Sequence, residues 1–253
     1  MRLEERRLLK VGLIGGGLIA LIPVAYLTGL LVWGSRLTPP PTPSSAPAPP
    51  LVKDALWARA GGGRATELRG VNPINMAGLM ICSNLAGGGD DPQRLDGEDL
   101  AECAKWQPAV AGIEYLSSLH GNDHQIPRAS FRGGASAMAT VLRLSHSWTR
   151  EEFLNTLAAR ADFGYGWQGI DAAARGFFGT TAAQLTPPQA AFLASRVGDI
   201  RTDPWCEPAA ALRMRNRILD RMRNNGALDD TQYQAAMAKT LELVSQPAAS
   251  RCP

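Results

Sequence analysis

The feature that most constrains this chain is a run of 23 uncharged residues, 11–33, which begins directly after Lys10. A helix rises about 1.5 Å per residue, so a run of this length can cross the roughly 30 Å hydrocarbon core of a bilayer. Tyr26 and Trp33 lie toward its far end, where amphipathic rings favour the membrane interface. The apolar core of a signal peptide is usually only about 7–15 residues long, so the run is interpreted as an uncleaved transmembrane helix.

Basic residues predict the orientation of this span. Arg2, Arg6, Arg7 and Lys10 precede it, whereas only Arg36 follows closely. Because basic residues are enriched on the cytoplasmic side, residues 1–10 are predicted to be cytoplasmic and the chain after the span periplasmic. We therefore expect a single-pass protein of the inner membrane.

A proline-rich segment, residues 34–50, follows the span. Residues 39–50 within it cannot form a helix or a central strand and favour an extended polyproline II conformation. The segment is predicted to be a linker, and these twelve residues would hold the domain up to roughly 35–40 Å from the bilayer. Residues 51–253 are enough for one domain with its own core. The formal net charge of only +3 gives no reason to expect a nucleic acid partner.

The four cysteines are Cys82, Cys103, Cys206 and Cys252, and none of them lies in a CxxC pair. An even number of cysteines in an oxidising compartment indicates two disulfide bonds, and sequence alone allows three connectivities. We expect Cys82–Cys103 and Cys206–Cys252, because each closes a modest loop and the second would fix the C-terminal tail.

The periodicity and capping signals of the exported part are helical, so a mainly α fold is predicted. Thr149 and Glu152 form a capping box that starts a helix, and a second helix over 170–178 ends at Gly179. Further helices are predicted to start at Thr186, to cover 208–225, and to run from a cap at Asp229 or Asp230 to about residue 244. The region 51–135 is less regular; short helices are expected at 51–60, 75–85 and 100–119.

Three motifs follow one another in register in the second half of the chain. Residues 149–154 read Thr-Arg-Glu-Glu-Phe-Leu, residues 163–179 read Phe-Gly-Tyr-Gly-Trp-Gln-Gly-Ile-Asp-Ala-Ala-Ala-Arg-Gly-Phe-Phe-Gly, and residues 215–222 read Arg-Asn-Arg-Ile-Leu-Asp-Arg-Met. They are similar to Ser-Lys-x-Glu-Ile-Leu, Phe-Gly-x-Gly-x-x-Gly-Ile-x-x-Ala-Ala-x-x-Tyr-Phe-Gly and Arg-Asn-x-Val-Leu-x-x-Met of glycosyltransferase family 51, the peptidoglycan polymerase module of penicillin-binding proteins and monofunctional transglycosylases. The resemblance covers residues 149–236.

The resemblance implies a lysozyme-like transglycosylase domain with a glycan-binding cleft. It implies lipid II or peptidoglycan strands as ligand, and an envelope protein complex is a further candidate partner. No cofactor is expected. His120 and His124 are four residues apart, but Gly121, Asn122 and Asp123 between them indicate a loop, so no metal site is predicted. The residues expected to contact ligand are Phe163, Gly164, Gly166, Trp167, Gly169 and Arg175.

The catalytic motifs depart from the family. Its general base is a glutamate followed by His and Gly, and Glu114, with His120 and Gly121 after it, is the best match. The spacing is short, however, and the accompanying Asp, Arg and Phe are absent, so the interpretation of Glu114 as an ordinary solvated helix residue is favoured. Residues 133–136, Gly-Gly-Ala-Ser, resemble the family's Gly-Gly-Ser-Thr but lie too close to Thr149. Either the middle of the domain is deleted, or this is a glycine loop matched by chance.

Neutral residues stand where the family has charged ones. Ala137 falls at the second glutamate, Asn155 at the glutamate after Ile-Leu, Thr180 at the lysine after Phe-Gly, and Gln189 at a glutamate of the following helix. Sugar polymerisation needs a positioned base and groups that hold the leaving pyrophosphate. We therefore expect a weakly active or inactive pseudoenzyme that binds glycan or a partner. The alternatives are an active glycosyltransferase and a lytic, glycan-cleaving enzyme with Glu114 as general acid.

Overall fold

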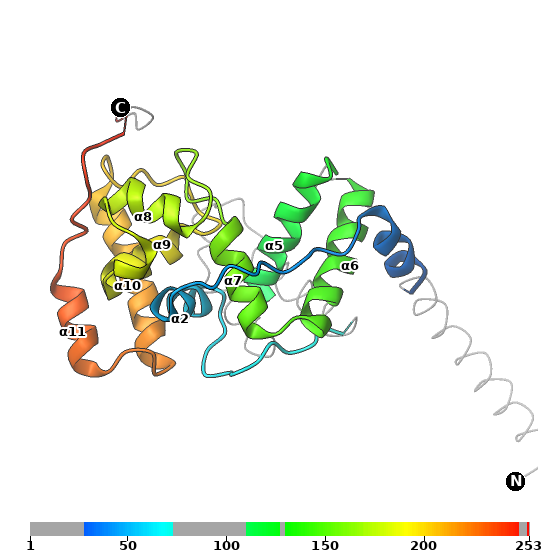
Figure 1. Ribbon diagram of the computed structural model, residues 1–253, viewed down its shortest axis with the longest axis horizontal. Helices are drawn as coiled ribbons and strands as arrows, with labels where there is room; N and C mark the ends of the chain where they lie inside the picture. The colour runs from blue at the N-terminus through cyan, green and yellow to red at the C-terminus, as the bar shows by residue number, and fades with distance from the viewer. Residues whose placement is uncertain (1–27, 73–109, 127–129, 248–251, 253) are drawn as a thin grey trace, which may run out of the picture.

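The computed structural model describes residues 28–72, 110–126, 130–247 and 252 (Figure 1). These residues are mainly helical, as predicted, and contain no strand beyond an isolated bridge between Asp162 and Gln168. A helical segment covers residues 28–37. The helices after it are α2 (Pro50–Arg59), α5 (Val110–Asp123), α6 (Phe131–Ser147), α7 (Arg150–Arg160), α8 (Ile170–Phe178), α9 (Pro187–Arg196), α10 (Pro208–Asn224) and α11 (Asp230–Ala238).

Local signals in the sequence place the helices of the second half correctly. Glu152 N–H donates to Thr149 Oγ1 over 3.2 Å, and Glu152 Oε2 accepts from Thr149 N–H, so the predicted capping box is present. The predicted helix over 170–178 is α8, and Gly179 follows it in the left-handed conformation with φ of 64°. The box at Thr186 is also present, with Gln189 Oε1 accepting from the Thr186 N–H.

The core gathers around α9, which packs against α10 and α2. Residues 190–196 of α9 and Val197, which follows the helix, are all buried. α2 packs in turn against α7 and α10, so a helix that precedes the family-like region completes its core. The largest buried apolar side chains of this core are Trp57, Phe153, Phe163, Phe177 and Phe192.

The C-terminal helix is shorter than predicted. Asp229 caps α11 as expected, but the helix ends at Ala238 rather than near residue 244. The guanidinium of Arg215 on α10 donates to the carbonyls of Met237 and Lys239, which satisfies the end of the helix from outside. Beyond it the chain is extended, and Val244 N–H donates to Phe177 O over 2.9 Å. Cys206 and Cys252 form the expected disulfide bond, while Cys82 and Cys103 lie outside the described residues.

The glycine-containing segments of the first half are helical rather than looped. Residues 133–136 lie in the first turns of α6, with Ser130 Oγ accepting from the Gly133 N–H, so the glycine loop was a wrong prediction. α5 likewise continues through Gly121 to Asp123, so the loop predicted between His120 and His124 is wrong as well. Packing between α5 and α6 accounts for both, because burial overrides the low helix propensity of glycine. α2 confirms the helix expected at 51–60; the one expected at 75–85 lies outside the described residues.

Most of the predicted transmembrane span, residues 11–27, also lies outside the described residues. Among the helices that the structure does describe, none combines the length and the apolar character needed to cross a bilayer.

The proline-rich segment does not act as a spacer. Residues 34–37 of the predicted linker are helical, because they belong to the 28–37 helix, and Pro50 starts α2. Residues 38–49, here named the proline strap, are extended as predicted, but they run across α6, α5 and α7 and lead directly into α2 (Figure 1). Thr38 and Ala48 are buried, with 4% and 7% of their surface exposed. The strap therefore belongs to the folded domain. Composition predicted its conformation and gave no information about what it would contact.

Candidate functional site

The turn between α7 and α8, residues 162–169, carries most of the residues predicted to bind ligand. Phe163 N–H donates to Trp167 O over 3.1 Å, and Trp167 N–H donates to Gly164 O over 2.9 Å. The Asp162 carboxylate accepts from the Gly164 N–H over 2.8 Å. Gly164, Gly166 and Gly169 all have φ between 79° and 89°, which explains why glycines are found there.

Burial separates the six predicted ligand residues. The ring of Phe163 is wholly buried, so solvent does not reach it. Trp167 is half-buried and packs against Phe177, Tyr165 and Trp205, with ring centroids 4.7, 5.2 and 6.5 Å away. Gly164 and Gly169 are also buried, whereas Gly166 and Arg175 are exposed. Arg175 and Gly166 are the members of the predicted set that solvent reaches most freely.

Arg196 is a buried cation that sequence reasoning did not single out. Only 1% of its surface is exposed, and its guanidinium donates to the carbonyls of Phe163, Ile200 and Thr202. It therefore joins the 162–169 turn to the loop after α9. Burial lowers the pKa of Arg196, and the acidic groups of Asp199, Asp203 and Asp162 oppose that effect. Nothing in the sequence around a single arginine at a helix end indicates such a role.

The turn makes a testable prediction about stability. A Cβ added to Gly169 would lie 2.8 Å from Ala159 O, in a conformation with φ of 80°. We expect Gly169→Ala to lower the free energy of unfolding by roughly 2–4 kcal/mol, because backbone strain and a backbone clash add together. Gly166→Ala is the matched control: its φ is 79° and nothing lies within 4 Å of the new Cβ, so only about 1 kcal/mol should be lost. Urea unfolding measures both; equal losses would show that the close approach is unimportant.

A second group of residues lies on α5, α6 and α7 and is here named the motif surface: His120, Ser136 and Asn155. Asn155 stands at a family-motif position in the ungapped register, whereas His120 and Ser136 lie in segments that resemble family motifs with a different spacing. All three contact the proline strap. His120 Nε2 lies 2.8 Å from Pro39 O, Ser136 Oγ lies 3.2 Å from Thr38 Oγ1, and Asn155 Oδ1 accepts from the Ala48 N–H over 3.0 Å. Burial lowers the pKa of His120, opposed by its bond to Pro39.

The neutral residues at positions that the resemblance pairs with charged family residues also have structural partners. Thr180 Oγ1 donates to Gln184 Oε1 over 3.2 Å, and Gln189 caps α9. The backbone carbonyl of Ala137 accepts from Ser117 Oγ over 3.0 Å, which ties α6 to α5. Glu114 lies within α5, but its side chain is outside what the structure describes.

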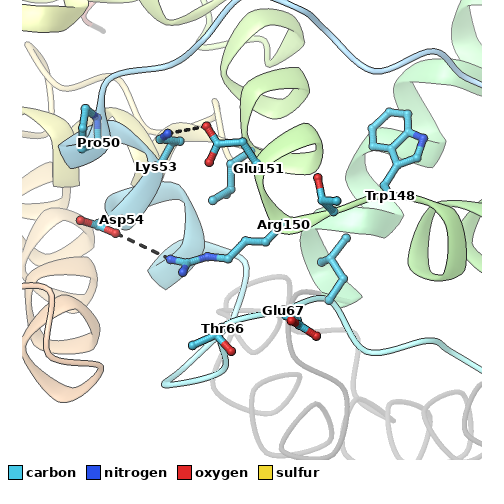
Figure 2. A pocket seen from close by; sticks show the side chains of 11 residues that line it. Pro50, Lys53, Asp54, Thr66, Glu67, Trp148, Arg150 and Glu151 are labelled. Carbon is cyan, nitrogen blue, oxygen red and sulfur yellow. Dashed lines mark hydrogen bonds and ion pairs between the residues drawn. The ribbon is translucent and has the colours of Figure 1, made fainter.

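A pocket of about 600 Å³ opens between α2 and the start of α7. Figure 2 shows Lys53 and Asp54 of α2 on one wall, Arg150 and Glu151 of α7 on another, and Thr66 and Glu67 on the loop below. Trp148 also lines it. None of the ligand residues predicted from the sequence borders this pocket.

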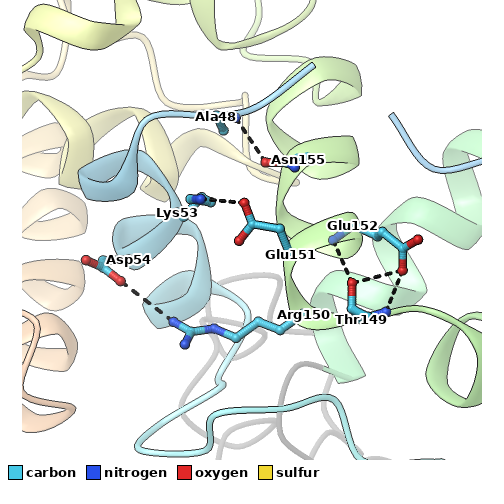
Figure 3. Close-up of polar contacts among 8 residues, drawn as sticks. All are labelled: Ala48, Lys53, Asp54, Thr149, Arg150, Glu151, Glu152 and Asn155. Atoms are coloured by element: carbon cyan, nitrogen blue, oxygen red, sulfur yellow. Dashed lines mark hydrogen bonds and ion pairs between the residues drawn. The ribbon is translucent and has the colours of Figure 1, made fainter. Parts of the chain in front are cut away.

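Four charged residues of the pocket form two ion pairs (Figure 3). Lys53 Nζ lies 2.6 Å from Glu151 Oε1, and an Arg150 terminal nitrogen lies 3.7 Å from Asp54 Oδ1. Burial raises the pKa of Asp54, and the positive charges of Arg150 and Lys53 oppose that rise. The Arg150 guanidinium also lies 4.6 Å from the centroid of the Trp57 ring. These contacts brace α2 against α7. Among the described residues, no group of three or more His, Cys, Asp or Glu side chains is placed to hold a metal ion.

Comparisons with known proteins agree with the motifs. Residues 119–223 match the family model described as Transglycosylase. Similar proteins include penicillin-binding protein 1A of Streptococcus pneumoniae, 30% identical over 98 residues that cover 38% of this chain and 14% of that protein. Penicillin-binding protein 1A/1B of Bacillus subtilis is 25% identical over 190 residues, 74% of this chain and 19% of that protein. A biosynthetic peptidoglycan transglycosylase of Acinetobacter baumannii is 30% identical over 98 residues, 39% of this chain and 43% of that protein. The chain thus spans less than half the length of each.

Proposed function

We propose that this chain binds peptidoglycan strands or lipid II and polymerises lipid II weakly or not at all. The proposal rests on residues 119–223, which form a transglycosylase-like domain. We also propose that the domain has a lysozyme-like fold, is tethered to the inner membrane through residues 11–33 and faces the periplasm. The basic residues before that run and the Cys206–Cys252 disulfide support this location.

The observation that carries the proposal is the state of Asn155. In the family register this position holds a glutamate, and here a neutral amide holds the backbone N–H of Ala48. A side chain that is to act as a general base on a substrate must be ionisable. Asn155 is not, and Ala137, Thr180 and Gln189 carry no charge either. What remains is a scaffold whose folding elements are intact and whose charged chemistry is reduced, which favours binding over catalysis.

Arg175 is our proposed contact to glycan on this scaffold. It is exposed on α8, one turn before Gly179, and no predicted ligand residue carries a positive charge besides it. A guanidinium donates several hydrogen bonds in a fixed geometry, which suits hydroxyl, carboxylate and phosphate groups of lipid-linked sugars.

We expect Arg175→Ala to reduce retention of the purified protein on peptidoglycan sacculi about fivefold to tenfold, because one hydrogen bond from a charged group is lost. Arg213→Ala is the matched control, since Arg213 is an exposed arginine on α10, and its retention should be unchanged. Co-sedimentation at several protein concentrations measures both. Absence of wild-type retention would disprove the binding proposal. Equal losses in both variants would show that retention is due to non-specific charge attraction.

A further inference from the structure

We propose that the motif surface is part of the glycan site and that the proline strap is its displaceable cover, which keeps this surface closed until ligand lifts it. This inference rests on the proposed function for the identity of the ligand. The chain itself supplies the occupant of the surface: an extended segment that lies across α6, α5 and α7 (Figure 1).

The strap contacts are directed at the three side chains of the motif surface. Three of its hydrogen-bonding groups engage His120, Ser136 and Asn155, the three members of the motif surface. A further contact joins Ser44 N–H to Thr156 Oγ1, next to Asn155, over 2.8 Å. While the strap is docked, His120 Nε2, Ser136 Oγ and Asn155 Oδ1 are used by the chain itself. A glycan can replace the strap at these atoms only after the strap contacts break.

The strap is attached more weakly than the helices beneath it. Thr38 and Ala48 near its two ends are its buried residues, and Pro39, Pro40, Thr42, Pro43, Ser45, Ala46 and Pro47 between them are exposed. No large apolar side chain anchors it. Polyproline II needs no internal hydrogen bonds, so the segment keeps its conformation when it leaves and loses little when it returns. Segments with few buried apolar contacts open at low free energy while the core remains folded.

Both ends of the strap are fixed to the domain, so opening is a local event. Before it, the 28–37 helix lies against α6: a Cβ at Gly34 would meet Ala135 O at 2.3 Å, and Arg143 donates to Ser35 O over 2.8 Å. After it, Pro50 starts α2, which is part of the core. The middle of the strap can lift while the helices at each end stay in place.

Hydrogen exchange tests the opening without any ligand. In the full-length protein in detergent, we expect the Ser44 and Ala48 amides to exchange at least about a hundredfold faster than the Ala173 and Ala174 amides of α8, which exchange only when the core opens. Thr38→Val with Ser44→Pro removes two strap contacts and should speed exchange at Ala48 at least about fivefold. Thr42→Val with Ser45→Pro is the matched control, because both residues are exposed, and should leave it unchanged. Strap amides as protected as those of α8 would overturn the proposal.

A reversible lock tests the link to ligand binding. The hydroxyl oxygens of Thr38 and Ser136 are 3.2 Å apart, so Thr38→Cys with Ser136→Cys places two sulfurs within reach of a disulfide bond. We expect the oxidised variant to bind lipid II in detergent micelles at least about tenfold more weakly than the same variant after reduction, while wild-type protein treated identically changes less than twofold. Equal affinity of locked and reduced forms would overturn the cover. If no form binds lipid II, the proposed function fails, and the exchange experiment alone decides whether the strap opens.

Discussion

Replacing Arg196 by alanine is expected to destabilise the domain by roughly 3–5 kcal/mol. Its side chain is almost entirely buried, and its guanidinium donates to the carbonyls of Phe163, Ile200 and Thr202. Alanine removes the donor from these carbonyls, of which that of Phe163 belongs to a fully buried residue, and opens a cavity beside Tyr165 and Phe177, whose ring centroids lie 5.8 and 5.6 Å from the guanidinium carbon.

Two comparisons separate the geometry of Arg196 from its charge. Arg196→Lys keeps the charge but offers a single compact ammonium in place of a planar fork, so we expect it to recover less than half of the loss. Arg201→Ala removes an arginine whose side chain is 73% exposed and should change the free energy of unfolding by less than about 0.5 kcal/mol. Guanidinium chloride unfolding measures all three. A loss below about 1 kcal/mol for Arg196→Ala would show that these hydrogen bonds do not hold the turn.

Local chemistry made the second half of the chain predictable. The starts of α7, α9 and α11 and the end of α8 are fixed by residues within four positions of each boundary, such as the Thr149–Glu152 box and the left-handed Gly179. Such signals act through the backbone of the helix itself, so one sequence contains all the information that they need.

The first half was less predictable because its structure depends on partners distant in the sequence. Gly133 and Gly121 lower helix propensity, yet α5 and α6 pack against each other and remain helical through them. The early end of α11 has the same kind of cause, since Arg215 of α10 supplies the donors to its last carbonyls. No local sequence pattern predicts contacts between residues so far apart in the chain.

The helices and the turn of the site could be predicted from the sequence, but the side-chain contacts between them could not. The sequence indicated the glycines of the 162–169 turn correctly, but it could not show that the Phe163 ring is buried or that Arg196 holds the turn. It also placed Asn155 at a charged family position without revealing that Ala48, 107 residues earlier, is its partner. The strap was interpreted as a spacer because proline content determines backbone conformation and says nothing about docking.

Loss of polymerase chemistry is the other large effect that we expect. A positioned general base contributes about 10²–10⁴-fold to such a rate, and electrostatic stabilisation of the leaving group about as much again. Ala137, Asn155, Thr180 and Gln189 supply no charge at the four positions where the family has it. Asn155, Thr180 and Gln189 use their side chains for structural hydrogen bonds instead. Rearranging these side chains would not restore a missing carboxylate or ammonium group.

The covering strap and the missing charges make different predictions about activity. If the strap alone suppressed polymerisation, the variant Thr38→Val with Ser44→Pro would polymerise faster than the wild type. If the chemistry itself is absent, the loosened variant should remain as inactive as the wild type.

The most direct test is a lipid II polymerisation assay on the full-length protein in detergent, with the Acinetobacter baumannii biosynthetic peptidoglycan transglycosylase as reference. Wild-type protein, the strap-loosened variant and Glu114→Gln are compared at equal concentration, and glycan chains are resolved by length. We expect all three to form chains at least about 10²–10⁴-fold more slowly than the reference, with no difference among them. Long glycan chains from the wild-type or loosened protein that disappear in Glu114→Gln would contradict the account and identify a working glycosyltransferase with Glu114 as its base.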